Sequence, residues 1–389
     1  MPFAAALSHH PDAAVAAGEA IGQCFEGAGP EPDLAVVFVT PHHLGAFGAI
    51  TSTIQATLEP RHLLGASAVA VLGGGHGIEG PPGLALWVGR FRGTIETTWI
   101  RAERSEGGYA VRGLDPARLD RARTLLVVAD PYSLPLDGIL AHLGRDHPNL
   151  RVIGGLASAP GGPGVNRLVI DGRVVDHGAV GVLLDVDAAP ATVVSQGCRP
   201  VGQPFTVTAA EGNVVVQLGG RPALQRLYEV LDGLDPIDRA AFARGPQCGI
   251  VVDDAKLDYE RGDFVIRGIV GIDRDRGTVA VGDTVPVGAT VQFQVRDAAS
   301  AGEDLAALLA PHAADAALVF TCNGRGAHLF GTADHDPALV QDLLGPRAAV
   351  AGMFCAGELG PIGRRNVLHG FTASVALFRD TPGPGDAAA

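Results

Sequence analysis

Three polar segments in the C-terminal part of the chain carry residue types that bind small molecules. They are CNGRG at 322–326, GELGP at 357–361 and HGFTA at 369–373. A guanidinium such as that of Arg325 binds a carboxylate through two parallel hydrogen bonds, and a carboxylate such as that of Glu358 binds an ammonium group. Asn323 and Thr372 can supply the remaining hydrogen bonds. This set of side chains fits a zwitterion, so we expect an amino-acid-like ligand.

The glycines of these segments suit a backbone that lies against a ligand. Gly324, Gly326 and Gly357 leave room for backbone amides to approach a ligand closely. The first two segments follow apolar runs, and ligands of α/β sheets lie beyond the carboxyl ends of the strands. Two structural readings stay open. GRG can be a tight turn with a solvated arginine, and Arg325 and Glu358 can form a salt bridge with each other.

Cys322 and His369 are the candidate catalytic residues. Cys322 lies at a predicted strand end beside backbone donors, and His369 and Glu358 are its possible partners. These are the residue types of a hydrolase or transferase that uses a cysteine nucleophile. The structural alternatives are a buried strand cysteine and a histidine that binds a neighbouring loop. A third class of function, a protein-interaction scaffold, predicts a large exposed apolar patch instead of a polar pocket.

Asp130 is the ligand-binding candidate of the N-terminal half. It follows the apolar run TLLVVA, as Asn323 follows AALVFTC, so we expect it to face the same crevice as the C-terminal segments. The alternative is that Asp130 and the following proline form a turn that caps the next helix.

The chain offers little for a metal or a cofactor. His42, His43 and His76 are the histidines from which a metal site could be drawn, but adjacent residues of a strand point apart and the chain lacks HExxH and CxxC motifs. The segment GHGIEG at 75–80 fits the GxGxxG pattern, yet prolines follow it instead of a helix, so we expect a loop. We therefore expect no metal and no cofactor.

One pattern of elements recurs three times and must position these residues. Each copy contains, in this order, a continuous apolar run, a helix-like segment, a glycine-containing apolar run and a third strand. The first runs are 33–40, 124–131 and 316–323; the helices are 43–58, 134–143 and 337–344, the last with Asp336 as its N-cap; the second runs are 63–72, 152–159 and 350–357; the third strands begin at 83, 178 and 369. Continuous apolar runs predict strands covered on both faces.

The stretch between the second and third copies has a different character. It contains a helix at 221–231, apolar runs at 249–252, 264–270 and 291–295, hairpin-like turns YERGD and RDRGT, and a helix at about 300–309. This predicts a mostly antiparallel section. We expect an α/β protein of two lobes with mixed sheets covered by helices, with domains at 1–222 and 223–379 and a disordered tail at 380–389.

Composition limits the partners. The chain has 389 residues, a net charge of −13 and a single lysine, Lys256, so binding to nucleic acid or to a membrane surface is not expected. Five widely spaced cysteines indicate reduced thiols, no basic leader precedes the first apolar stretch, and no apolar run approaches the ~20 residues of a membrane span. We expect a cytoplasmic protein. Nothing in the sequence fixes its oligomeric state.

The ordered set of motifs resembles a known family. NGRG followed by LFG at 329–331, then GELGP, then HGFTASVALF, is similar to the C-terminal half of FIST domains, and residues 33–184 are similar to the N-terminal half. The resemblance implies a sensory module of bacterial-type signal transduction that binds small ligands such as amino acids. Family members are often joined to signalling domains or to an F-box. These 389 residues contain no such segment, so we expect a free binding protein or an enzyme.

Overall fold

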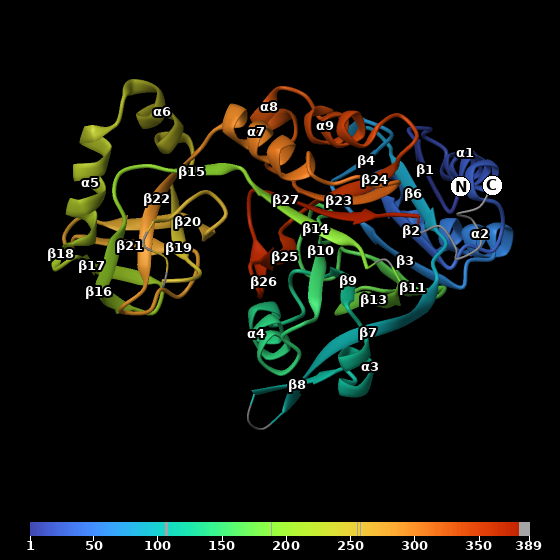
Figure 1. The fold of residues 1–389 in the computed structure, drawn as a ribbon, viewed down its shortest axis with the longest axis horizontal. Coiled ribbons are helices and arrows are strands. Elements are labelled where there is room, and N and C mark those ends of the chain that lie inside the picture. Colours follow the sequence, from blue (N-terminus) through green and yellow to red (C-terminus); the bar gives the residue numbers. More distant parts are fainter. Residues whose placement is uncertain (106–107, 188, 255, 257, 381–389) are drawn as a thin grey trace. The chain divides into compact units, whose positions relative to one another are not determined.

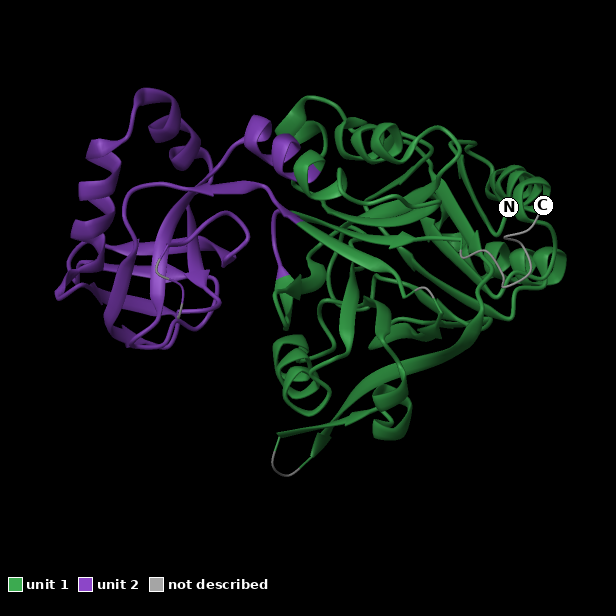
Figure 2. Ribbon diagram, viewed as in Figure 1, with its two compact units in different colours: residues 1–194, 306–368, 372–389 green, residues 195–305, 369–371 purple. Residues whose placement is uncertain are grey.

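The computed structural model describes residues 1–105, 108–187, 189–254, 256 and 258–380. The described chain forms two compact units (Figure 2). Unit 1 contains residues 1–194, 306–368 and 372–380, and unit 2 contains residues 195–305 and 369–371. The domain boundary expected at 222 therefore lies inside unit 2. Of the expected tail at 380–389, only Asp380 lies within the described residues.

The three predicted strand–helix–strand–strand copies are present in unit 1 (Figure 1). In each copy the first two strands pair in parallel, and the third strand pairs antiparallel with the first. The copies are β2 Leu34–Val39, α2 Phe47–Leu58, β3 His62–Ser67 and β6 Leu84–Gly89; β9 Thr124–Ala129, α4 Leu136–Asp146, β10 Arg151–Leu156 and β13 Ala179–Val186; and β23 Ala316–Cys322, α9 His335–Leu344, β24 Ala349–Cys355 and β27 Thr372–Phe378.

Each copy also begins with an additional strand and a helix. The additional strand pairs with the third strand of its copy, and the helix leads into the first. These pairs are β1 Phe3–Ser8 with α1 Ala13–Ala28, β7 Gly93–Ser105 with α3 Pro116–Arg121, and β14 Ala191–Gln196 with α7 Ala298–Leu309. β8 Gly108–Arg112 pairs with β7. Most of unit 2 is therefore an insertion in the third copy, between β14 and α7; the unit also takes in the end of β14, residues 298–305 of α7 and residues 369–371.

Each second strand contains a glycine at the same position, where the first strand comes too close for a side chain. A Cβ on Gly65 would lie 2.2 Å from the Val37 oxygen, and a Cβ on Gly352 would lie 1.9 Å from the Val319 oxygen. The corresponding distance for Gly154 is 1.8 Å, to the oxygen of Val127. The glycines that the sequence shows early in each second run are thus required by strand packing.

The three copies exchange hairpins. After its second strand, each copy sends a hairpin into the sheet of another copy, where it pairs antiparallel with that copy's second strand. The hairpins are β4 Ala70–Gly73 with β5 His76–Glu79 in the third sheet, β11 Leu168–Ile170 with β12 Arg173–Val175 in the first, and β25 Glu358–Ile362 with β26 Arg365–His369 in the second. The exchange links the three sheets cyclically.

This exchange corrects two expectations. The apolar run 63–72 is two strands in two sheets, because the chain leaves β3 after Ser67 and enters β4 at Ala70. The segment GHGIEG is not a loop: residues 76–79 form β5, and the turn precedes them. The next element after β5 in the described chain is the strand β6, and not a dinucleotide-binding helix.

Helix starts also differ from the prediction. A 3₁₀ helix, Pro41–Ala46, precedes α2, so the α-helix begins at Phe47 and not at residue 43. α9 begins at His335 with Asp334 as its N-cap, so the assignment of Asp336 as the N-cap was wrong. Asp336 lies in the first turn of α9, and its carboxylate is used elsewhere.

Alternating residues of the nine central strands point to a shared core. Val36 and Phe38, Leu126 and Val128, and Leu318 and Phe320 belong to one buried cluster that all three sheets enclose. The opposite faces are covered by helices: α1 and α2 cover the first sheet, and α3 and α4 cover the second. α9 packs on β23 and β24 (Figure 1). The strand ends that carry the candidate residues are fixed by this layered arrangement.

Unit 2 is a small closed barrel, which confirms the predicted antiparallel section. Its strands pair in a ring because β22 contacts both β16 and β19. The ring order is β16 Phe205–Glu211, β17 Val214–Leu218, β21 Thr278–Val281, β20 Phe264–Asp273, β19 Gln247–Val251 and β22 Thr290–Arg296. The unit also contains most of α7, two short strands, β15 Cys198–Pro200 and β18 Arg221–Pro222, and the helices α5 Ala223–Gly233 and α6 Pro236–Arg244.

No helix in the described part of the chain is long and apolar enough to cross a membrane.

Candidate functional site

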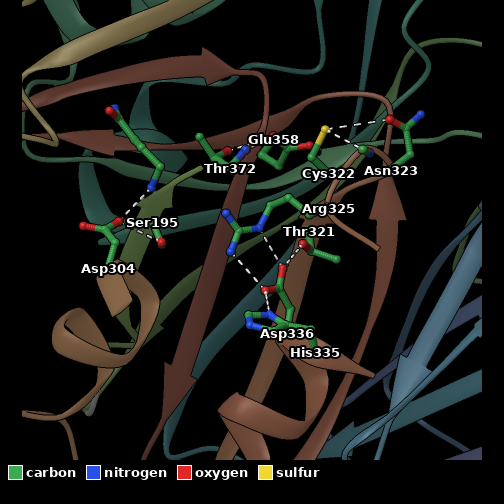
Figure 3. Close-up of polar contacts among 12 residues, drawn as sticks. Ser195, Asp304, Thr321, Cys322, Asn323, Arg325, His335, Asp336, Glu358 and Thr372 are labelled. Carbon is green, nitrogen blue, oxygen red and sulfur yellow. Dashed lines mark hydrogen bonds and ion pairs between the residues drawn. The ribbon is translucent and has the colours of Figure 1, made fainter. Parts of the chain in front are cut away.

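Arg325 forms a buried, bidentate ion pair with Asp336 (Figure 3). Its Nε donates to Asp336 Oδ2 at 2.7 Å and its Nη2 donates to Asp336 Oδ1 at 3.0 Å. Thr321 Oγ1 donates to the same carboxylate at 2.5 Å, and the ring of His335 lies 3.0 Å from it. Burial disfavours an ionised Asp336, but the Arg325 charge and these hydrogen bonds outweigh it and hold the pKa of Asp336 well below its usual range.

The ion pair changes the role open to Arg325. The sequence suggested that this guanidinium binds a ligand carboxylate through two hydrogen bonds, but Asp336 occupies that bidentate position. One nitrogen, Nη1, is buried and has no hydrogen-bond partner among the described residues. Arg325 therefore keeps one unpartnered nitrogen, Nη1, for another group. The salt bridge between Arg325 and Glu358, which the sequence left open as an alternative, is not formed within the described residues.

Glu358 is the first residue of β25, and it is completely buried. Its Oε2 accepts hydrogen bonds from the backbone nitrogen of Thr372 at 3.1 Å and from Thr372 Oγ1 at 2.8 Å. Its Oε1 has no hydrogen-bond partner at normal distance within the described chain. Burial raises the pKa of Glu358 to about 8, although Thr372 and the nearby Arg325 and Cys322 favour the charged form. The carboxyl group is therefore mostly neutral at pH 7.

Glu358 stands where the other two copies have apolar residues. In each sheet, the residue after the shared glycine faces one residue of the exchanged hairpin. Gly155 faces Glu358, Ala66 faces Leu168, and Met353 faces Val71. Leu168 and Val71 are fully buried in the core. The fold itself thus has no need of a carboxyl group at this position.

Two cysteines lie next to Glu358. Cys322 and Cys355 end the neighbouring parallel strands β23 and β24 and face each other in register. The Gly324 backbone nitrogen lies 3.4 Å from Cys322 Sγ, and only 5% of Cys322 is exposed. Burial raises the pKa of Cys355 well above its usual value, so this thiol stays protonated. A Cβ on Gly155 would lie 2.3 Å from Cys355 Sγ, which leaves that position to glycine.

The glycine-rich segment after β23 serves the protein's own packing. Gly326 is buried, and a Cβ on it would lie 1.7 Å from Glu79 Oε1. This oxygen accepts a hydrogen bond from the Ala327 nitrogen at 2.9 Å, at the start of the short helix α8 Ala327–Phe330. The sequence suggested that Gly326 leaves room for a ligand, and it gave no indication that Glu79 occupies this space.

The remaining candidates have different surroundings. Asn323 is exposed beside Cys322, and the buried Gly357 accepts a hydrogen bond from Leu156 through its carbonyl oxygen. Asp130, directly after β9, is buried and accepts a 2.9 Å hydrogen bond from Asn166 Nδ2, so it belongs to the strand ends of the second copy. His369 is buried at the end of β26 and is grouped with unit 2.

The candidates therefore divide into groups. Cys322, Glu358 and Thr372 lie together in unit 1, with Arg325 close enough to influence Glu358. Asp336 belongs to this cluster but was missed, because eleven residues separate it from Arg325 and its sequence context suggested only a cap. Within the described residues no three His, Cys, Asp or Glu side chains form a group that could hold a metal ion, and His42, His43 and His76 are included in that statement.

Comparison with known proteins gives the family. The family model of the FIST N domain matches residues 33–221, and that of the FIST C domain matches residues 223–361. An uncharacterized protein of Mycobacterium bovis is 44% identical over 95% of this chain and 97% of its own length. An uncharacterized protein of Mycobacterium tuberculosis is 42% identical over 98% of this chain and 100% of its own. FIST domains are associated with sensory and ligand-binding roles. The chain belongs to the FIST family.

Proposed function

We propose that the protein is a sensory module that binds a small amino-acid-like metabolite beside Cys322, Glu358 and Thr372, at the carboxyl ends of β23 and β24. The observation that carries this proposal is the buried Glu358. It replaces the Leu168 and Val71 of the other copies, and its Oε1 lacks a partner within the described chain. A buried polar atom without a partner costs about 1–3 kcal/mol, which a ligand would recover.

Glu358 and Arg325 each fit one end of an amino acid: Glu358 the ammonium group and Arg325 the carboxylate. An ammonium group next to Glu358 would donate a hydrogen bond to Oε1, and its positive charge would favour the ionised carboxylate. A ligand carboxylate would accept a hydrogen bond from Arg325 Nη1, the nitrogen that does not bond to Asp336. Asn323 is exposed at the end of β23, beside Cys322, and would offer the ligand a further hydrogen bond. The family's ligand-binding role supports the same reading.

Glu358 is a better test residue than Arg325. Removing the Arg325 guanidinium would leave the buried Asp336 carboxylate without its counter-ion, and breaking a buried pair costs about 3–5 kcal/mol. An Arg325→Ala variant would therefore lose stability for reasons unrelated to a ligand. Glu358→Gln keeps the size and the hydrogen-bond acceptor for Thr372 and removes only the ionisable group.

The experiment is a thermal-shift screen with the common amino acids and their close relatives. We expect at least one zwitterion to raise the melting temperature of the wild-type protein. Glu358→Gln should abolish that rise, while Glu26→Gln, an exposed glutamate of α1, should preserve it. An undiminished rise in a folded Glu358→Gln variant would remove Glu358 from the binding site and contradict the proposal.

A further inference from the structure

Two arginines lie on the same tryptophan ring in unit 1. The central carbon of the Arg101 guanidinium is 4.3 Å from the Trp99 ring centroid, and that of Arg173 is 4.2 Å from it. Trp99 and Arg101 belong to β7, and Arg173 begins β12. We call these three residues the arginine–tryptophan cluster. Stacking on an aromatic face orients a guanidinium and leaves its edge free to donate hydrogen bonds.

The surroundings of Trp99 hold the cluster in place. Its Nε1 donates a hydrogen bond to the backbone oxygen of His177 at 3.2 Å, and its ring packs against the core shared by the three sheets. Gly178 leaves the space that this arrangement needs: its φ is +83°, and a Cβ there would lie 2.9 Å from Trp99 Nε1 and 3.5 Å from Arg101 Cγ. The arginines are therefore presented by a fixed ring, which lowers the conformational entropy that they lose on binding a ligand.

Neither arginine of the cluster is neutralised within the described chain. There, Arg101 and Arg173 make no hydrogen bond and no ion pair through their side chains, and the Nε of Arg101 is buried without a partner. The described carboxylates on β7 and β12, or in the turns beside β12, have other partners: Glu96 pairs with Arg118, Glu103 with Arg112, Asp171 with His62, and Asp176 with His177. Both positive charges of the cluster are thus left for a ligand.

A third arginine adds to the positive charge. Arg101 and Arg112 are directly opposite each other in the antiparallel pair of β7 and β8, so their side chains lie on the same face of the sheet. Like charges in this position destabilise a sheet. Glu103 offsets only part of the repulsion, because its contact with Arg112 is 3.5 Å long and both of these side chains are more than half exposed. A bound anion would relieve the repulsion that remains.

We propose that the arginine–tryptophan cluster binds a phosphate group. The two guanidinium carbons are separated by no more than the sum of their distances from the ring centroid. A phosphate accepts hydrogen bonds of about 2.9 Å on opposite sides, so it can bridge two guanidiniums at such a separation. A carboxylate has two oxygens and is satisfied by one arginine, whereas a phosphate group has three free oxygens and close to two negative charges. Two arginines without carboxylate partners therefore favour a phosphate group.

Free phosphate and a small phosphate monoester offer the same oxygens to the cluster. Titrations with inorganic phosphate and with glycerol 3-phosphate distinguish these two sources. Tighter binding of glycerol 3-phosphate would indicate a monoester site, and an equal or lower affinity for it would indicate a site for free phosphate. The site shares no residue with the proposed amino-acid site and does not depend on it.

Tryptophan fluorescence reports binding at the cluster. The chain has two tryptophans, and Trp87 is fully buried in the core, so a phosphate bound by Arg101 and Arg173 should change the emission of Trp99. We expect a saturable change with at least one of the two probes, weaker binding at higher salt, and a much weaker response to acetate. The change in emission should disappear in Trp99→Phe.

Substitutions of single arginines test the role of each guanidinium. Arg173→Gln and Arg101→Gln should each raise the dissociation constant about tenfold or more, as loss of a charge-assisted hydrogen bond implies. Arg173 is exposed, so its variant should keep the fold, and a melting curve checks this for both variants.

Arg104→Gln is the matched control. Arg104 is an exposed arginine of β7 that also lacks an ion pair within the described chain, but it lies three residues from Arg101 and therefore on the opposite face of the strand. This variant should bind with unchanged affinity. The absence of a saturable response to both probes, acetate binding as tight as phosphate binding, an unchanged affinity in Arg173→Gln, or an equal loss of affinity in Arg104→Gln would each overturn the proposal.

Discussion

Glu358 makes the stability of the protein depend on pH in a particular direction. Its pKa is raised to about 8 by burial, while an unfolded glutamate has a pKa near 4.3. The folded state therefore holds the proton more tightly. The stability associated with the neutral carboxyl is fully present below about pH 4.3 and is lost as the pH rises toward about 8, at roughly 1.4 kcal/mol per unit of pKa difference.

Glu358→Gln should remove this dependence. The glutamine stays neutral at every pH, so we expect the variant to gain stability relative to the wild type between about pH 5 and pH 8, with the difference growing as the pH rises. Urea unfolding at several pH values measures it. Glu26→Gln serves as the control and should show no such growth. A difference that stays constant across this range, or that shrinks with pH, would contradict a raised pKa at Glu358.

The residues of the site were only partly predictable. Arg325 and Glu358 stood out because charged residues follow apolar runs, and Thr372 because a hydroxyl residue begins the next one; the structure puts Glu358 and Thr372 in direct contact. The partner of Arg325 could not be found in this way, because Asp336 precedes Pro337 and that context suggests a helix cap. Which buried acid neutralises which base is decided by three-dimensional packing, which local sequence does not encode.

At the scale of elements, the three copies could be predicted because each strand is a continuous apolar run and each helix separates two of these runs. The exchange of hairpins between the copies could not be predicted. Ala68 and Val69 join β3 to β4 without a proline, a glycine or a charge, so the run 63–72 looks like one strand. The consequence for the site is large, because Glu358 belongs to a hairpin that joins the sheet of the second copy and not that of its own.

The shared glycine of the second strands should be sensitive to any side chain. A Cβ on Gly352 would lie 1.9 Å from the Val319 oxygen, so Gly352→Ala must push two paired strands apart. We expect a loss of more than about 3 kcal/mol of stability, comparable to severe overpacking of a core. Denaturant unfolding checks this value.

Gly22→Ala in α1 provides the comparison. No atom lies within 4 Å of the added Cβ, and alanine favours a helix over glycine by about 1 kcal/mol, so this variant should be slightly more stable. Equal changes in the free energy of unfolding for Gly22→Ala and Gly352→Ala would refute the argument from strand packing.

At the scale of the whole chain, one architecture is used three times, and polar chemistry is concentrated in one copy. The carboxyl end of the first strand is followed by Thr40 in the first copy and by Asp130 in the second, whereas the third ends in Cys322. Only the third copy contributes a buried glutamate at the hairpin position that the others fill with Leu168 and Val71. The third copy also carries the barrel of unit 2 as an insertion. Specialisation of one repeat is the pattern expected when a fold supplies the frame and one copy supplies the function.

Proton release on ligand binding tests the central claim most directly. Titration calorimetry of the best amino-acid ligand at pH 7, in buffers with different ionisation enthalpies, counts the protons exchanged. Because Glu358 is mostly neutral below a pKa of about 8 and an ammonium group favours its ionised form, the account predicts release of close to one proton per ligand at pH 7 and none in Glu358→Gln. Tight binding of the amino acid to the wild-type protein at pH 7 without proton release would contradict it.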